Sequence, residues 1–255
     1  MSDHWYTQSG EPAYEVPAKN GSMRPTTLRD ARKLGLVPSV TTVLSVIDKP
    51  QLVNWKVRQG IMAALTLPPI DGESEHDWLK RIEADSQEQA KEAAAEGSRI
   101  HDAIERSFKG LVVDETYKPH VQAVHAELAR LFPGVSDWEA EESFSAQEGF
   151  GGKVDLHSPS TGIVVDFKGK DGDFTDGKRL AYDQHWQLAA YQCGLILSTA
   201  PCANIFVSRT HPGKVSSHVW SEHDLAEGWR VFYSALQLWK SLKGFDPSFG
   251  LARAA

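Results

Sequence analysis

The chain reads GGKVDL over residues 151–156 and IVVDFK over residues 163–168. Both runs are rich in apolar and β-branched residues, and the SPSTG segment between them has the composition of a turn. The two runs are therefore expected to form an antiparallel hairpin near the middle of the chain. This hairpin is the element around which the rest of the fold can be predicted.

Two aspartates and a lysine share one face of this hairpin. If Ser160 and Thr161 form the tip, Asp155 lies directly opposite Asp166, and Lys168 follows on the same face. Opposed residues have Cβ atoms about 4.5–5.5 Å apart, which lets two carboxylates share a divalent cation. The apolar residues of the other face, which can bury against a helix layer, are Val154, Leu156, Val165 and Phe167. Taken alone, the pattern is also compatible with a surface hairpin whose charges are solvated.

The segment Asp85–Lys109 is expected to form one flanking helix. Apolar and small residues recur along it at three- and four-residue spacing, and Gly110 follows as a stop signal. His101 lies on this stripe, four residues after Gly97, whose missing side chain allows another backbone or a metal site to approach closely. A histidine buried for packing alone is the alternative interpretation.

The segment Asp183–Ser198 is expected to form a second flanking helix. Gln187 and Tyr191 are four residues apart, so their side chains project from the same side of that helix and can face the cleft. By itself this pair is also typical of a buried tyrosine with a polar neighbour.

Taken together and in chain order, these groups resemble the RecB-type branch of the PD-(D/E)XK nuclease superfamily. The motifs are Gly97-x-x-x-His101, Gly152-x-x-Asp155, Asp166-x-Lys168 and Gln187-x-x-x-Tyr191. The resemblance implies an α/β fold with a restriction-endonuclease-like core, in which helices flank a central mixed β-sheet. It also implies metal-dependent hydrolysis of phosphodiester bonds.

The resemblance implies the metal ligands by motif. The side chains of His101, Asp155 and Asp166 are expected to bind the ion, and the backbone carbonyl of Phe167 completes the protein's share. Oxygen ligands with one imidazole suit Mg²⁺ or Mn²⁺ better than zinc. Glu142 is a further candidate acid.

Three more residues are implied to act in catalysis. Lys168 is expected to orient the attacking water or to neutralise the negative charge that develops on the phosphate. Gln187 and Tyr191 are expected to position Lys168 and the nucleic-acid backbone near the cut.

A second, shorter similarity lies near the N-terminus. The run PSVTTVL at residues 38–44, with Lys49-Pro50 and the NWK of residues 54–56 after it, resembles phage-encoded exonucleases of this branch and the mitochondrial genome maintenance exonuclease. Short helix starts rich in serine and threonine are an alternative source of this pattern.

The length of 255 residues, with 41% hydrophobic and 24% charged residues, is typical of a globular enzyme. We expect a single nuclease domain over residues 1–255. Its N-terminal part, 1–84, is expected to be mostly helical and to cover the cleft, and the nuclease core is expected over 85–255. A loop at 66–77 is the best internal boundary.

Three further elements follow from local patterns. A strand is expected at residues 141–147, and a hairpin is expected from segments 203–209 and 214–220 with its turn at 211–213. Ser221 and Asp224 have the spacing of a helix cap and predict a final helix that ends at about Lys243.

The net charge of −7 argues against a broad basic surface for DNA, although a local positive groove is sufficient for a nuclease. Weak, salt-sensitive DNA binding is therefore expected. The basic candidates that flank the motifs are Lys49, Lys56, Arg99 and Lys170, with Arg58, Lys178 and Arg179 as further members.

The cysteine content and the N-terminus bear on cofactor and compartment. Cys193 and Cys202 cannot supply the four thiolates of the iron–sulfur cluster that some relatives carry, so no iron–sulfur cluster is expected. They also indicate no disulfide framework, which favours a reducing compartment. Without a signal sequence or an apolar stretch of about 18 residues, the protein is expected to be cytoplasmic and not membrane-bound.

The expected activity is that of a metal-dependent DNA exonuclease that prefers single-stranded ends, in phage or bacterial replication, recombination or repair. One alternative is an exonuclease that resects duplex ends. Another is a DNA end-binding module without catalysis. No particular protein partner is indicated.

Overall fold

The computed structural model describes residues 3–48 and 50–250. Its α-helices, in chain order, are α1 (Leu28–Leu34), α2 (Val40–Leu44), α3 (Pro50–Thr66), α4 (Glu75–Phe108), α5 (Lys118–Leu131), α6 (His185–Gly194) and α7 (Glu222–Lys243), and a 3-10 turn, η1 (Glu115–Tyr117), precedes α5. Its strands are β1 (Trp5–Tyr6), β2 (Glu15–Pro17), β3 (Met23–Pro25), β4 (Val37–Pro38), β5 (Glu139–Ala140), β6 (Ser143–Ala146), β7 (Phe150–Lys153), β8 (Leu156–His157), β9 (Val164–Lys170), β10 (Cys202–Ser208) and β11 (Val215–Trp220).

Five strands form the central sheet in the order β11-β10-β9-β8-β5. Strands β9 and β10 run parallel, and the other neighbours run antiparallel. The sheet is therefore mixed, and the prediction of an α/β fold is confirmed at this level. The predicted hairpin that turns at residues 211–213 is confirmed as β10 and β11. Every residue of β10 is buried, as expected for a strand covered on both faces.

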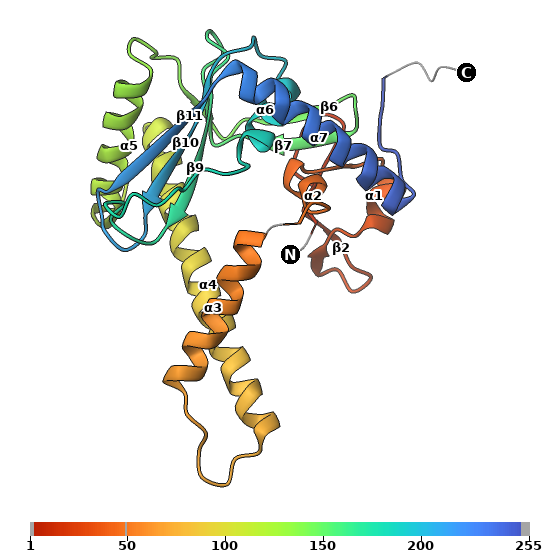
Figure 1. Cartoon of the computed structure of the whole chain (residues 1–255). Coiled ribbons are helices and arrows are strands. Elements are labelled where there is room, and N and C mark those ends of the chain that lie inside the picture. Colours follow the sequence, from red (N-terminus) through yellow and green to blue (C-terminus); the bar gives the residue numbers. More distant parts are fainter. Residues whose placement is uncertain (1–2, 49, 251–255) are drawn as a thin grey trace.

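Helices cover both faces of this sheet (Figure 1). Helices α4 and α5 pack on one face, where Ile100 and Val124 contact a cluster that includes Val165 and Phe167; we call this the α4-side core. Helices α6 and α7 pack on the other face in a cluster that includes Val164, which we call the α7-side core. Alternate residues of β9 thus enter different cores, because side chains of a strand alternate between its faces.

The N-terminal segment is built into the α7-side core. Trp5, on β1, is fully buried and packs against Trp239 of α7, with ring centroids 6.1 Å apart. Burial of a large apolar side chain contributes about 1.5–3 kcal/mol to the stability of the fold, so the burial of Trp5 stabilises the packing of the N-terminal segment against α7. The part of the chain before α3 contains four short strands as well as helices α1 and α2, which is less helical than the sequence indicates.

Helix α3 and the first half of α4 form a helical hairpin that extends away from the sheet (Figure 1). Its connecting loop lies within the boundary predicted at residues 66–77. Helix α4 starts ten residues earlier than the predicted Asp85, because Ser74 caps it by accepting a hydrogen bond from the backbone of Asp77. Acidic residues in the first turn also favour this start, since they complement the helix dipole.

Two other predicted boundaries are corrected. The helix expected over residues 183–198 is shorter and ends at Gly194, and Ile196 then adopts a left-handed φ of 56° that no helix accommodates. The strand expected over residues 141–147 is reduced to β6, because Glu141 has a φ of 63° and leaves the strand conformation. The final helix is confirmed as α7, with the predicted capping box.

The predicted central hairpin is present but interrupted. Strand β8 pairs with β9 in the register Leu156 to Val165, and one further step of this register sets Asp155 opposite Asp166, as expected. The predicted strand 151–156 is nevertheless not continuous: β7 pairs with β6, and β8 pairs with β9. At the break the Asp155 carbonyl accepts a hydrogen bond from the Glu141 N–H, and Glu141 lies between β5, which pairs with β8, and β6, which pairs with β7.

Among the described helices, none combines the length and the apolar character that a bilayer span needs.

Candidate active site

A line of polar side chains joins β9 to α6. The Lys168 ammonium donates to Asp166 Oδ1 at 2.8 Å and to Gln187 Oε1 at 3.2 Å. The Gln187 amide in turn donates to the Tyr191 hydroxyl at 2.7 Å. Strand alternation sets the first two residues on one face, and four-residue helical spacing aligns the other two. The structure therefore brings together four of the site residues predicted from the sequence.

Asn204 of β10 holds Asp166 from behind. Its Nδ2 donates to Asp166 Oδ2 at 2.7 Å, and its Oδ1 accepts a hydrogen bond from the Trp220 indole at 2.8 Å. Asn204 is fully buried and lies beside Asp166 in the parallel register of β9 and β10. It is not among the residues predicted from the sequence. The sequence feature that could have indicated Asn204 is an amide side chain within an otherwise apolar strand, since a buried amide requires hydrogen-bond partners.

Asp155 and His101 meet at the edge of this line. His101 Nδ1 lies 3.7 Å from Asp155 Oδ2, and this same oxygen accepts a hydrogen bond from the backbone N–H of Phe167 at 2.8 Å. The His101 ring is edge-on to the Phe167 ring, with centroids 6.2 Å apart. Asp155 is thus held by the strand that carries Asp166, and His101 reaches it from α4.

Two glycines of the predicted motifs differ in what they accommodate. A Cβ atom on Gly152 would lie 2.8 Å from Tyr191 Cε1, so only glycine lets the tyrosine pack here. A Cβ atom on Gly97 would have no neighbour within 4 Å, contrary to the expected close approach over its missing side chain. The close contact is instead made at Gly169, whose Cβ would lie 3.5 Å from the Gly97 Cα.

Burial and neighbouring charge shift several pKa values at the site. Burial raises the pKa of Asp166 and Asp155 raises it further, although Lys168 opposes the change. Burial acts against the ammonium of Lys168, but Asp166 and Asp155 outweigh it and raise its pKa. Burial and the same two carboxylates raise the pKa of Tyr191, so its hydroxyl stays protonated and donates hydrogen bonds or accepts them as a neutral group.

The donor chemistry fits a hard divalent cation, but the donors are not gathered around one point. Asp155 and His101 face each other, whereas both oxygens of Asp166 are engaged by Lys168 and Asn204. Each carboxylate oxygen has a second lone pair, so these bonds leave Asp166 able to bind a cation. Across residues 3–48 and 50–250, no three His, Cys, Asp or Glu side chains come close enough together to form a metal cluster. The four-ligand site, with the Phe167 carbonyl, stays a prediction.

The basic candidates lie on several elements. Lys56 is exposed on α3, and Lys170 is exposed at the end of β9. Arg99, on α4, is paired with Glu96 at 2.6 Å. Lys49 lies outside the described residues. The further acid proposed from the sequence, Glu142, is exposed.

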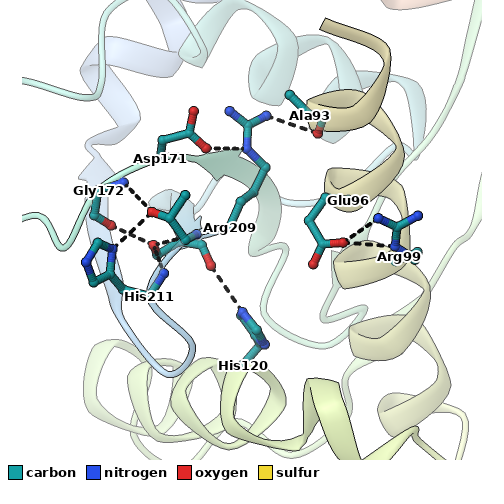
Figure 2. Close-up of polar contacts among 10 residues, drawn as sticks. Ala93, Glu96, Arg99, His120, Asp171, Gly172, Arg209 and His211 are labelled. Carbon is teal, nitrogen blue, oxygen red and sulfur yellow. Dashed lines mark hydrogen bonds and ion pairs between the residues drawn. The ribbon is translucent and has the colours of Figure 1, made fainter. Parts of the chain in front are cut away.

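A cavity of about 470 Å³ lies between α4 and the ends of β9 and β10 (Figure 2). Arg209, which was not predicted from the sequence, donates to Asp171 at 2.8 Å and to the Ala93 carbonyl at 3.2 Å. Glu96 pairs with Arg99 on the opposite wall (Figure 2). Because acidic side chains line this cavity alongside the two paired arginines, it lacks the excess positive charge that a phosphate site requires.

Comparison with known proteins gives distant similarities. No protein-family model and no curated protein matches the chain. One similar solved structure is that of a phage related exonuclease from Haemophilus somnus 129PT, with 14% sequence identity and a TM-score of 0.30. The match covers 57% of this chain and 82% of the exonuclease chain. The structure of SSO0001 matches 56% of this chain and 72% of its own, with 16% identity and a TM-score of 0.28. The functional assignment therefore rests on the residues of the site.

Proposed function

We propose that the protein hydrolyses phosphodiester bonds in DNA and that the site around Asp166 and Lys168 carries the reaction. The observation that carries this proposal is the pair formed by the buried Asp166 and the half-buried Lys168. Asn204 holds Asp166 from behind, Gln187 accepts from Lys168, and Asp155 lies one strand away. A lysine fixed in this way costs no reorganisation when negative charge develops on a phosphate.

The role of Lys168 follows from its donors. An ammonium group has three N–H donors, and Asp166 and Gln187 accept two of them. The third is left for a water molecule or a phosphate oxygen, and about a third of the side chain (31%) is exposed. Tyr191 acts through Gln187 and fixes the direction from which Lys168 approaches the substrate.

A bound Mg²⁺ or Mn²⁺ is part of the proposal. When present, such an ion polarises the phosphate and lowers the pKa of its bound water. Asp155, Asp166 and His101, with the carbonyl of Phe167, are the residues proposed to hold it. The contact of 3.7 Å between Asp155 and His101 supports two of these ligands. Cys193 and Cys202 are proposed to hold no iron–sulfur cluster.

The substrate is proposed to be a single-stranded DNA end, and the setting phage or bacterial replication, recombination or repair in the cytoplasm. The motif order supports this choice. An exonuclease requires a free end, so circular single-stranded DNA should resist cutting. Efficient cutting of the circle contradicts the exonuclease assignment and leaves the hydrolytic site in place.

The decisive experiment is a gel assay with 5′- and 3′-labelled single-stranded and duplex DNA, in Mg²⁺, Mn²⁺ or EDTA. Wild-type protein should degrade DNA in metal but not in EDTA, and Lys168→Ala and Asp166→Ala should lose activity by 10²-fold or more, roughly the effect of removing one charge-stabilising group. Lys214→Ala, an exposed lysine in the turn between β10 and β11, is the matched control and should retain activity.

The other outcomes are equally informative. Preferential cutting of blunt duplex supports the end-resection alternative. Binding of DNA without cutting in either metal contradicts catalysis and favours the end-binding module. If all four proteins cut equally, the activity does not belong to this site.

A further inference from the structure

A cluster of three aromatic side chains lies on the outer face of β1. Trp5 points into the α7-side core, so its neighbours His4 and Tyr6 project from the opposite face of the strand. There His4 stacks on Tyr14, with ring centroids 4.6 Å apart and an interplanar angle of 29°. The hydroxyl groups of Tyr6 and Tyr14 are 2.6 Å apart. We call His4, Tyr6 and Tyr14 the β1 aromatic cluster.

The exposure of these rings is graded. Tyr6 is 3% exposed, Tyr14 is half-buried, and His4 is exposed. Tyr6 therefore anchors the cluster through its hydroxyl, while the stacked pair of rings reaches the solvent. A partly exposed pair of stacked rings with a buried anchor offers a flat ring surface at fixed orientation.

The backbone beneath the rings is fixed by the serine- and threonine-rich run of residues 38–44. The His4 carbonyl accepts a hydrogen bond from the Ser39 N–H at 2.8 Å, and the His4 N–H donates to Thr42 Oγ1 at 3.0 Å. The Tyr14 carbonyl accepts from the Thr26 N–H at 2.9 Å. These contacts reduce the freedom that the rings lose when a ligand binds.

The cluster adjoins the candidate active site across β7. A Cβ atom on Gly151 would lie 3.0 Å from Tyr6 Cβ, and a Cβ atom on the next residue, Gly152, would lie 2.8 Å from Tyr191 Cε1. Ser39 forms a bridge with Gly151 as well. Tyr6 and Tyr191 thus contact β7 at consecutive glycines, one on each face of the strand.

We propose that His4 and Tyr14 form a stacking platform for an unpaired base of a nucleic-acid strand whose backbone lies at the Asp166–Lys168 site. Stacking tolerates every base because every base has a π-face, so the platform recognises strandedness and not sequence. A base within a duplex is already stacked and paired, and cannot use it without unpairing. The inference rests on the proposed function and adds to it the feature that selects single strands.

The test measures binding in EDTA, so that no strand is cut. The probe is a fluorescein-labelled single-stranded oligonucleotide, either intact or with one abasic position at successive sites from the end. Tyr14→Ala and His4→Ala should weaken binding of the intact strand by about 5- to 150-fold, the effect of one lost base–aromatic stack. Tyr14→Phe keeps the ring and removes the hydroxyl contact with Tyr6, so it should weaken binding less than Tyr14→Ala does. Tyr233→Ala, an exposed tyrosine on α7, is the matched control.

The abasic strands separate stacking from other roles. Wild-type protein should lose affinity when the abasic position falls at one or two particular sites, and Tyr14→Ala should show no further loss with those strands. An equal loss by Tyr14→Ala for intact and abasic strands overturns the platform, as does a wild-type affinity that is independent of the abasic position. The second comparison needs no variant and therefore holds even if Tyr14→Ala is unstable.

The outcome for the platform is distinct from the outcome for catalysis. Position-dependent abasic losses in a protein that cuts no DNA retain the platform and contradict the nuclease proposal. Cutting by wild type with normal binding by His4→Ala and Tyr14→Ala retains the nuclease proposal and contradicts the platform. Absence of any single-strand binding by wild type contradicts both.

Discussion

Replacement of Asn204 by alanine tests how Asp166 is held. The change removes the donor from the Asp166 carboxylate, whose side chain is 3% exposed, and the acceptor from the buried Trp220 indole. A buried polar group left without a partner costs about 1–3 kcal/mol, and a charged group costs more. Two such groups predict a loss of about 2–6 kcal/mol in the free energy of unfolding. This is a large fraction of the roughly 5–15 kcal/mol of a typical domain.

The measurement is urea unfolding followed by circular dichroism, with midpoint and slope fitted separately. Trp220→Phe is the informative partner variant, because it removes the indole N–H together with part of the buried ring and leaves the Asn204 contact to Asp166 intact. The lost hydrogen bond should cost about 1–2 kcal/mol, and the smaller ring in a buried position adds a further loss. Asn54→Ala, at an exposed position on α3, should change stability by less than about 0.5 kcal/mol.

A loss below about 0.5 kcal/mol for Asn204→Ala, within the range of ordinary surface changes, refutes the reasoning. Asn204 acts through Asp166 and touches no substrate. In the nuclease assay its replacement should therefore lower kcat and leave KM nearly unchanged.

Three further predictions concern other parts of the molecule. Gly194→Ala should lower the free energy of unfolding in urea by at least about 1–3 kcal/mol, because its Cβ would lie 1.9 Å from an aromatic ring carbon. Gly97→Ala has open space around it in a helix and should raise this free energy by about 0.5–1 kcal/mol. Changes of the same sign contradict this expectation. Arg24 holds the pKa of Asp30 well below its usual range. The stability advantage of wild type over Asp30→Asn should therefore be full above about pH 5 and shrink as the pH falls below about 4. An undiminished advantage at pH 3 contradicts this prediction. Burial raises the pKa of the Cys202 thiol to about 12, so a disulfide reagent at pH 7.5 should label it slowly in the native protein and rapidly in urea, while equal rates contradict its burial.

The central hairpin shows how far local pattern determines structure. The turn composition and the alternation of apolar residues were sufficient to predict the register that sets Asp155 opposite Asp166, because both depend on neighbouring residues alone. The break in the strand at Asp155 was not predictable in this way. It coincides with Glu141 on the neighbouring segment, which has an unusual positive φ and donates a backbone hydrogen bond to Asp155.

The residues of the candidate site also differ in whether local sequence patterns could predict their contacts. Helical spacing predicted that Gln187 and Tyr191 project from the same side of one helix, because this depends on that helix alone. Their position beside Lys168 was implied by the family resemblance. Asn204 was not predicted, because its contact with Asp166 depends on which strand is inserted beside β9. That pairing joins residues far apart in the chain and leaves no local signature other than an amide in an apolar run.

The passage of the chain from one sheet to another at Asp155 gives the candidate site a mechanical position in the fold. Val154 and Leu156, on either side of it, are buried in different cores, and His101 and Tyr191 come from helices on opposite faces of the sheet. The site therefore lies where the two cores meet at the sheet. A ligand that contacts side chains from both faces binds only the folded protein, so it raises the unfolding temperature.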